Sequence, residues 1–279
     1  MSEDDEEGTA RMPIRLFPPI PADTAQAAEA VLGDENPFIK LGRQIDALVV
    51  ECVQVPDGKE MTCLDEKYPV LALATILQFM EKLTDGQMEF ASCTRLDIKY
   101  ALHLPLHYPG ISRSRLCDLR QAMYCHPTWC EVFQRVIDRL LEADLIIKRE
   151  GVQITTEQIL DEICAPSRVE GMMNVMQLTI EAAAARDSEW LRSIMKPNWF
   201  KRFTGRKIPR QIPLDRRQQE ELVVSLGNDM QYFLFHASSS SAVCGLPEIQ
   251  NLRTEWIRQF EEIPNYPPVW RKRCCAQFT

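Results

Sequence analysis

The side chains best suited to chemistry in this sequence are arginines and lysines that can contact phosphate groups. Arg113, Arg115 and Arg120 fall in one stretch, SRSRLCDLR, which follows a Pro-Gly pair. A helix that begins at Ser112 would carry all three, because a serine hydroxyl can accept hydrogen bonds from the first N–H groups of a helix. Arginines in such a helix contact phosphates or bases in helix-turn-helix proteins. The stretch therefore predicts a DNA contact.

A second basic stretch, which we call the basic belt, runs from residue 192 to residue 217. It holds nine basic residues and one acid, Asp215, although the whole chain carries a formal charge of -8. An acidic chain with one basic stretch is typical of a protein that meets a polyanion at a defined place. The basic residues are Arg192, Lys196, Lys201, Arg202, Arg206, Lys207, Arg210, Arg216 and Arg217.

Aromatic residues interleave with these cations and leave two readings open. Trp199, Phe200 and Phe203 can stack against bases, in which case Lys201, Arg202, Arg206, Lys207 and Arg210 contact DNA. Alternatively, the aromatic residues, together with Trp190, anchor a core and the cations form an ordinary wet surface. The sequence gives the two readings equal weight.

Metal sites have weak support. His103 and His107 are four residues apart, but Pro105 lies between them and no glutamate follows the first histidine. A zinc set can be drawn from Cys117, Cys125, His126 and Cys130, yet no C-x-x-C motif occurs, so buried cysteines are the better interpretation. Glycine-rich phosphate loops and nucleophile elbows are also missing from the sequence. We therefore expect no cofactor.

Composition predicts a globular protein. The chain has 279 residues, 45% of them apolar, which is enough for two domains or one large domain. Its first residues are acidic, unlike a secretory signal, so we expect a cytoplasmic protein whose ten cysteines are reduced. The longest apolar run, residues 70 to 80, is shorter than the roughly 18 residues that span a bilayer. No membrane partner is expected.

The apolar spacing predicts a mainly α fold. We expect four parts: a disordered acidic leader at 1–13, a helical N-terminal domain at 14–147, a second, mainly helical domain at 148–263, and an irregular tail at 264–279. Expected helices include 23–32, 37–52, a helix that starts at Pro69, one that starts at Pro127, 214–235 and one that starts at Pro247. A further helix after residue 156 is expected to break or bend at Ala165-Pro166-Ser167.

The first three arginines belong to a predicted helix-turn-helix unit. Asp85-Gly86 is read as a turn, followed by a helix to about residue 102. Pro105 and Pro109-Gly110 then form an elbow, since proline lacks an N–H group and disfavours helix in the residue before it. The arginine-bearing helix follows this elbow.

At this point the chain resembles bacterial insertion-sequence transposases of the InsH-like group. The resemblance rests on segments in one order: LTDGQMEFASCTRLDIKYALHLPL, ISRSRLCDLR, CEVFQRVIDRLLEADLI, NWFKRF, LGND and the helix around Trp256. It covers about residues 14 to 262. It implies a helical DNA-binding domain and binding of the element's terminal inverted repeats.

The same resemblance implies a DDE catalytic domain that holds two Mg²⁺ ions through three carboxylates. The first of these carboxylates falls on Thr155, which is neutral and a poor Mg²⁺ ligand. Glu157 or Asp161 would replace it only with a shifted register. We also read the chain as ending before the last two carboxylates, so we expect no catalysis from it alone.

Two functions from different classes remain. The first is the DNA-binding portion of a transposase that is truncated and inactive. The second is a protein-interaction module or regulator that self-associates or joins an intact transposase. A third possibility is an evolutionary remnant that still folds but has no function under selection.

Overall fold

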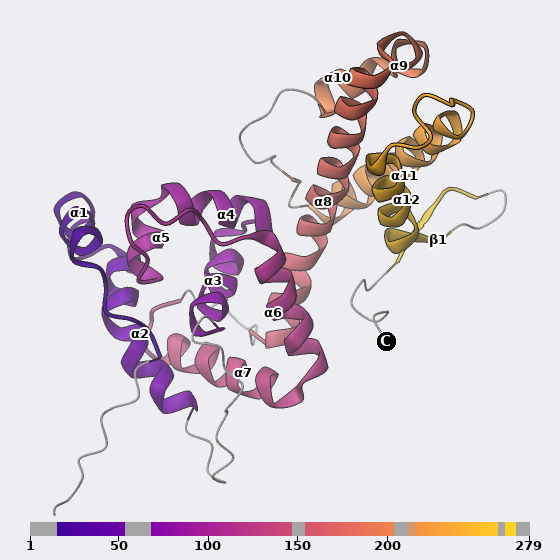
Figure 1. Ribbon diagram of the computed structural model, residues 1–279. Helices are drawn as coiled ribbons and strands as arrows, with labels where there is room; N and C mark the ends of the chain where they lie inside the picture. Colours follow the sequence, from indigo (N-terminus) through magenta and orange to yellow (C-terminus); the bar gives the residue numbers. More distant parts are fainter. Residues whose placement is uncertain are drawn as a thin grey trace, which may run out of the picture.

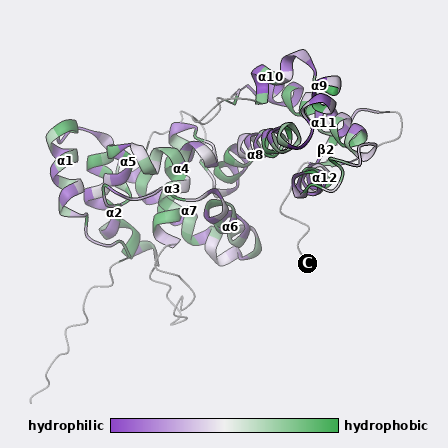
Figure 2. Cartoon of the chain, turned by 45° about the horizontal axis from the view of Figure 1, so that its top comes forward, coloured by the Kyte–Doolittle hydropathy of each residue, from purple (hydrophilic) through white to green (hydrophobic). Residues whose placement is uncertain are grey.

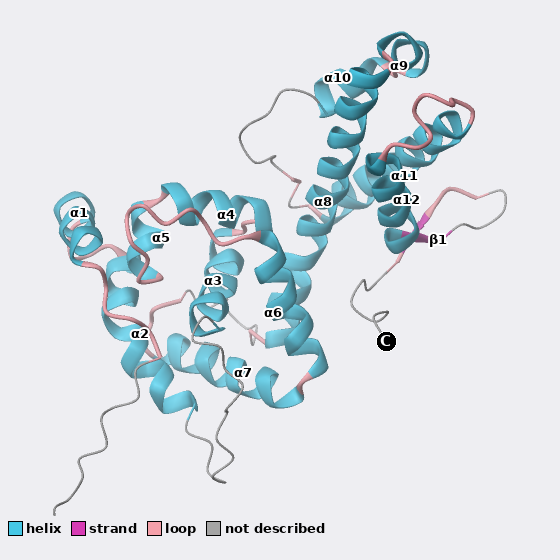
Figure 3. Ribbon diagram, in the orientation of Figure 1, coloured by secondary structure: helices cyan, strands magenta, loops and turns pink. Residues whose placement is uncertain are grey.

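The computed structural model describes residues 16–53, 68–146, 154–203, 212–213, 215–261 and 266–271. The predicted leader at 1–13 and the cations Arg206, Lys207 and Arg210 lie outside these residues. The prediction of a mainly α fold is confirmed, because the described residues form twelve helices and one short pair of strands (Figure 3). Among these helices, none is both long and apolar enough to cross a membrane.

The N-terminal region consists of seven helices (Figure 1). Six of them contribute to one core, while the first helix packs in a small separate cluster. Apolar residues at helical spacing and prolines at helix starts place most of them, as in α7, where Pro127 occupies the first turn. The helices are α1 (Ala22–Leu32), α2 (Pro37–Val53), α3 (Tyr68–Glu81), α4 (Asp85–Thr94), α5 (Leu96–Ala101), α6 (Arg113–Cys125) and α7 (Pro127–Glu142).

The C-terminal region is built on the second half of a long helix. Its elements are α8 (Thr156–Arg186), α9 (Ser188–Ile194), α10 (Pro197–Phe203), α11 (Arg216–Ser238), α12 (Pro247–Gln259), β1 (Phe260–Glu261) and β2 (Val269–Trp270). The two strands pair antiparallel, Phe260 with Trp270 and Glu261 with Val269. Hydrophilic and hydrophobic residues both occur along these helices, as the colours in Figure 2 show.

Helix α8 belongs to two hydrophobic cores. Ile159, Leu160 and Ile163 are buried in the core of the N-terminal region. Val169, Met172 and Met176 are buried in a separate core with residues of α9 to α12. The change from one core to the other thus lies within α8, whereas the predicted domain boundary lies at 147/148.

Two local predictions are wrong. The Asp85-Gly86 pair is the start of α4 instead of a turn before it, because Thr84 and Gln87 form a capping box. The expected single helix over 85–102 is divided at Arg95, whose backbone is extended.

A helix break at Pro166 is also not observed, since α8 continues through this proline for 31 residues. Proline removes one backbone hydrogen bond and normally disrupts a helix interior. Here the apolar faces on both sides of Pro166 are buried, each in its own core. Burial of both halves offsets the missing bond.

Candidate nucleic-acid interface

The elbow between α5 and α6 is fixed by the groups around it. The buried Lys99 ammonium donates to the carbonyl oxygens of Tyr108, at 3.1 Å, and Pro105, at 3.4 Å. Burial lowers the pKa of Lys99. Gly110 has φ 109°, and a Cβ there would stand 2.7 Å from the carbonyl oxygen of Glu89. The elbow therefore holds the start of α6 close against α4.

The first turn of α6 lacks a side-chain cap. Ser112 occupies the predicted cap position, but its hydroxyl lies 3.2 Å from the hydroxyl of Ser114 and accepts no backbone N–H group. Arg113 is exposed and Arg115 is half-buried in the same turn. Unpaired N–H groups and the helix dipole favour an anion at such a helix start. The turn thus combines two arginines with backbone donors.

Arg113 is paired in the structure. Its Nε atom donates to the Glu89 carboxylate at 3.1 Å, and the two side chains are 43% and 40% exposed. Such exposed ion pairs contribute little to stability because water and salt screen them. A phosphate oxygen can therefore replace Glu89 at small cost.

Arg120 is not part of an exposed surface. It is 3% exposed, and both of its terminal nitrogens donate to the carboxylate of Asp85. A DNA contact needs an exposed guanidinium, so the assignment of Arg120 to the interface is wrong for this conformation. A signal in the sequence does exist, because Leu116 and Met123 are buried at four and three residues from Arg120 and share its face.

A polar joint connects α4 to α8 beside these arginines. Ser167 of α8 accepts the backbone N–H of Asp85 at 3.1 Å, and Glu170 accepts that of Gly86 at 3.0 Å. A Cβ on Gly86 would stand 2.6 Å from both Glu170 carboxylate oxygens and 2.7 Å from a terminal nitrogen of Arg113. Glycine is therefore needed where Glu170 approaches the helix start.

The aromatic residues of the basic belt divide into core and surface. Trp199 and Phe203 are fully buried, so for these two the core reading is confirmed. Phe200, on the same helix, is instead 71% exposed. Lys201, the next residue, is exposed, and Arg192 is exposed on α9. Only one of the three interleaved aromatic residues, Phe200, is thus placed where it can meet a base.

Two cations of the belt share one buried carboxylate. Asp229 of α11, whose side chain is 6% exposed, accepts from Lys196 at 2.8 Å and from Arg202 at 2.8 Å. Arg202 also donates to the hydroxyl of Ser225 at 2.9 Å. The Lys196 ammonium lies 4.4 Å from the ring centre of Tyr232, in a cation–π contact. These cations are held in place instead of extending freely into solvent.

Two of the positions considered for metal have other roles in the structure. Thr155 caps α8, and its hydroxyl accepts the backbone N–H of Gln158 at 3.2 Å. His103 is buried, with its ring nitrogens 2.6 Å and 2.8 Å from the carbonyl oxygens of Pro18 and Gly42. Within the described ranges, no group of three or more His, Cys, Asp or Glu side chains is arranged to hold a metal ion.

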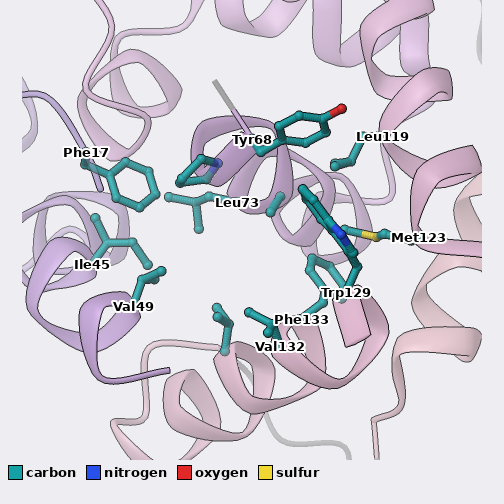
Figure 4. Close-up of a pocket in the computed structure, with 13 residues that line it drawn as sticks. Phe17, Ile45, Val49, Tyr68, Leu73, Leu119, Met123, Trp129, Val132 and Phe133 are labelled. Carbon is teal, nitrogen blue, oxygen red and sulfur yellow. The ribbon is translucent and has the colours of Figure 1, made fainter. Parts of the chain in front are cut away.

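An apolar cavity of about 60 Å³ lies between α2, α3, α6 and α7 (Figure 4). Its lining residues are apolar or aromatic and include Ile45, Leu119, Trp129 and Phe133. Small-molecule sites are usually about 300–1,000 Å³ and contain a few convergent polar groups. The cavity is therefore a packing gap in the core and offers no catalytic group.

No protein-family model, curated protein or solved structure matches the chain. The resemblance to insertion-sequence transposases therefore stays a prediction. The structure separates the predicted DNA-contacting residues by their exposure to solvent. Arg113, Arg115, Lys201 and Arg202 have surface access, whereas Arg120 is buried.

Proposed function

We propose that the chain is the DNA-binding portion of an insertion-sequence transposase. The observation that carries the proposal is the first turn of α6, where Arg113 and Arg115 stand beside uncapped backbone N–H groups on a rigid elbow. Phosphate is the anion that this combination suits. Terminal inverted repeats are the target that the resemblance implies.

The exposed surface of α6 favours phosphate contacts over base reading. Beyond the first turn, its exposed side chains include Cys117, Asp118 and Cys125, while Arg120 is buried. Base edges are read mainly by arginine, lysine, asparagine and glutamine. We therefore assign α6 the part of positioning the protein on the DNA backbone, which carries little sequence information.

Catalysis is not part of the proposal. In the intact family two Mg²⁺ ions perform the phosphoryl transfer, and the first carboxylate position falls on Thr155 here. The side chain of Thr155 is engaged in capping α8. The described residues are thus assigned to binding alone.

An electrophoretic shift assay with a DNA duplex tests the proposal across a range of salt concentrations. Wild-type affinity should fall steeply with salt, because phosphate contacts release counterions. The variant R113E/R115E should bind more weakly and lose about two units of the logarithmic salt slope. The control K40E changes an exposed lysine of α2 that pairs with Glu35, and it should bind like the wild type.

The alternative is a protein-interaction module that associates with an intact transposase. It would replace the proposal if no duplex bound at low salt while an intact transposase co-purified with the chain. Equal binding by R113E/R115E and the wild type would refute the role of α6.

A further inference from the structure

We infer that Lys196 and Arg202 form a preorganised binding site for a phosphate group. The Asp229 carboxylate, which binds both side chains, keeps them side by side. The inference deepens the proposed function, on which it rests for the source of the phosphate. It names a ligand chemistry and two specific cations within the basic belt. It concerns the junction of α10 and α11, not the α6 surface.

The charge balance of the cluster is the first argument. One cation is enough to neutralise a buried carboxylate, yet Asp229 is bonded to two, each at 2.8 Å. The group therefore keeps one net positive charge. This charge has solvent access, since the Lys196 and Arg202 side chains are 35% and 22% exposed.

The remaining donors are the second argument. An ammonium has three N–H groups and a guanidinium has five. Among the described residues, Lys196 donates to one oxygen, and Arg202 donates through a single nitrogen, Nη1, to Asp229 and Ser225. The Nε and Nη2 groups of Arg202 have no partner among these residues. Both cations can thus donate to an anion without releasing Asp229.

Preorganisation is the third argument. A free lysine or arginine loses side-chain entropy when it is fixed against a ligand. Lys196 is already fixed by Asp229 and by the ring of Tyr232, which lies 4.4 Å away. Arg202 is fixed by Asp229 and Ser225. Binding of a tetrahedral oxyanion therefore costs less entropy here than at an unrestrained basic surface.

The neighbours of the site fit a phosphate that belongs to a nucleic acid. Lys201, on the same helix, is exposed and adds positive charge. Phe200 is 71% exposed next to it. A base attached to a bound phosphate can stack on such a ring. Free phosphate would use the two cations alone.

The test measures binding of inorganic phosphate by ³¹P line broadening, with ionic strength kept constant by chloride. The wild type should bind, and K196Q and R202Q should each bind about tenfold more weakly, because each loses charge-assisted hydrogen bonds. The control is R217Q, which removes an exposed arginine of the same belt that pairs with Glu221. It should bind phosphate like the wild type. Far-UV circular dichroism of each variant checks its fold.

A second arm measures a single-stranded oligonucleotide and a duplex with the same proteins. If R202Q also lowers the salt slope for nucleic acid by about one, the phosphate belongs to the nucleic-acid backbone. If phosphate binding alone changes, the site serves free phosphate. If the wild type binds phosphate and no DNA, the site stands and the proposed function fails. Equal phosphate binding by wild type, K196Q and R202Q, or none by the wild type, overturns the inference.

Discussion

Replacement of Arg120 by methionine should destabilise the N-terminal region strongly. The guanidinium is 3% exposed and binds both carboxylate oxygens of Asp85, to which Gln78 also donates at 3.0 Å. Burial alone would lower the pKa of Arg120, but the Asp85 carboxylate more than compensates and the pKa is raised. The guanidinium therefore stays charged although it is buried. In R120M the Asp85 carboxylate would lose both arginine hydrogen bonds and keep the one from Gln78.

The expected cost follows from this geometry. Removal of one partner of a buried ion pair costs about 3–5 kcal/mol, because the other charge stays desolvated. That is a large part of the roughly 5–15 kcal/mol by which a domain is stable. Replacement of both partners by apolar side chains leaves no buried charge, so the variant D85L/R120M should cost less than the two single changes together.

Urea unfolding followed by far-UV circular dichroism measures these costs. The matched control is R139M, which removes an arginine that is 42% exposed and pairs with Glu51 and Glu142. Exposed pairs contribute about 0–1 kcal/mol, so the control should stay close to the wild type. The reasoning is refuted if R120M costs no more than R139M, or if the D85L and R120M costs simply add.

Two further predictions concern the same region. Gly86→Ala should lower the free energy of unfolding by about 1–3 kcal/mol, because the added Cβ would stand 2.6 Å from the Glu170 carboxylate. An unchanged midpoint of thermal unfolding would contradict this. The control is Gly171→Ala, where no atom lies within 4 Å of the added Cβ. Burial lowers the pKa of Lys99 in the folded protein below its value of about 10.4 in the unfolded chain. Between these two pKa values the unfolded chain binds more protons than the folded protein, so the contribution of Lys99 to stability rises with pH. The unfolding free energy of wild type minus that of K99M should therefore increase from pH 7 to pH 9.5, and a constant or falling difference would refute the assignment.

Local sequence patterns were sufficient for most helices. Pro127 and Pro247 start α7 and α12 as predicted, since proline suits the first turn and the apolar period follows it. The start of α4 was misread because the Asp85-Gly86 pair is a common turn signal, whereas the Thr84 and Gln87 capping box is the stronger one. The strand pair was missed because each strand has two residues and gives no period.

The candidate site was less predictable, because access depends on distant partners. Basic residue types pointed to Arg120 and Arg202 equally, yet the first is buried by Asp85, 35 positions away. Arg202 keeps solvent access while it binds Asp229, 27 positions away. The spacing of Leu116, Arg120 and Met123 could have marked the buried arginine. No local sequence pattern predicts that Asp229 binds both Lys196 and Arg202.

Helix α8 determines how the two basic surfaces can act together. Through Ser167 and Glu170 it binds the start of α4, the helix whose Glu89 pairs with Arg113. From Val169 onwards it packs in the same core as Trp199 of α10, the helix that carries Arg202. The α6 arginines and the α10 cations are thus connected by one continuous helix instead of a flexible linker. A nucleic acid that reaches both surfaces would meet the second one at a fixed distance, so the geometry of the ligand decides whether the two contacts reinforce each other.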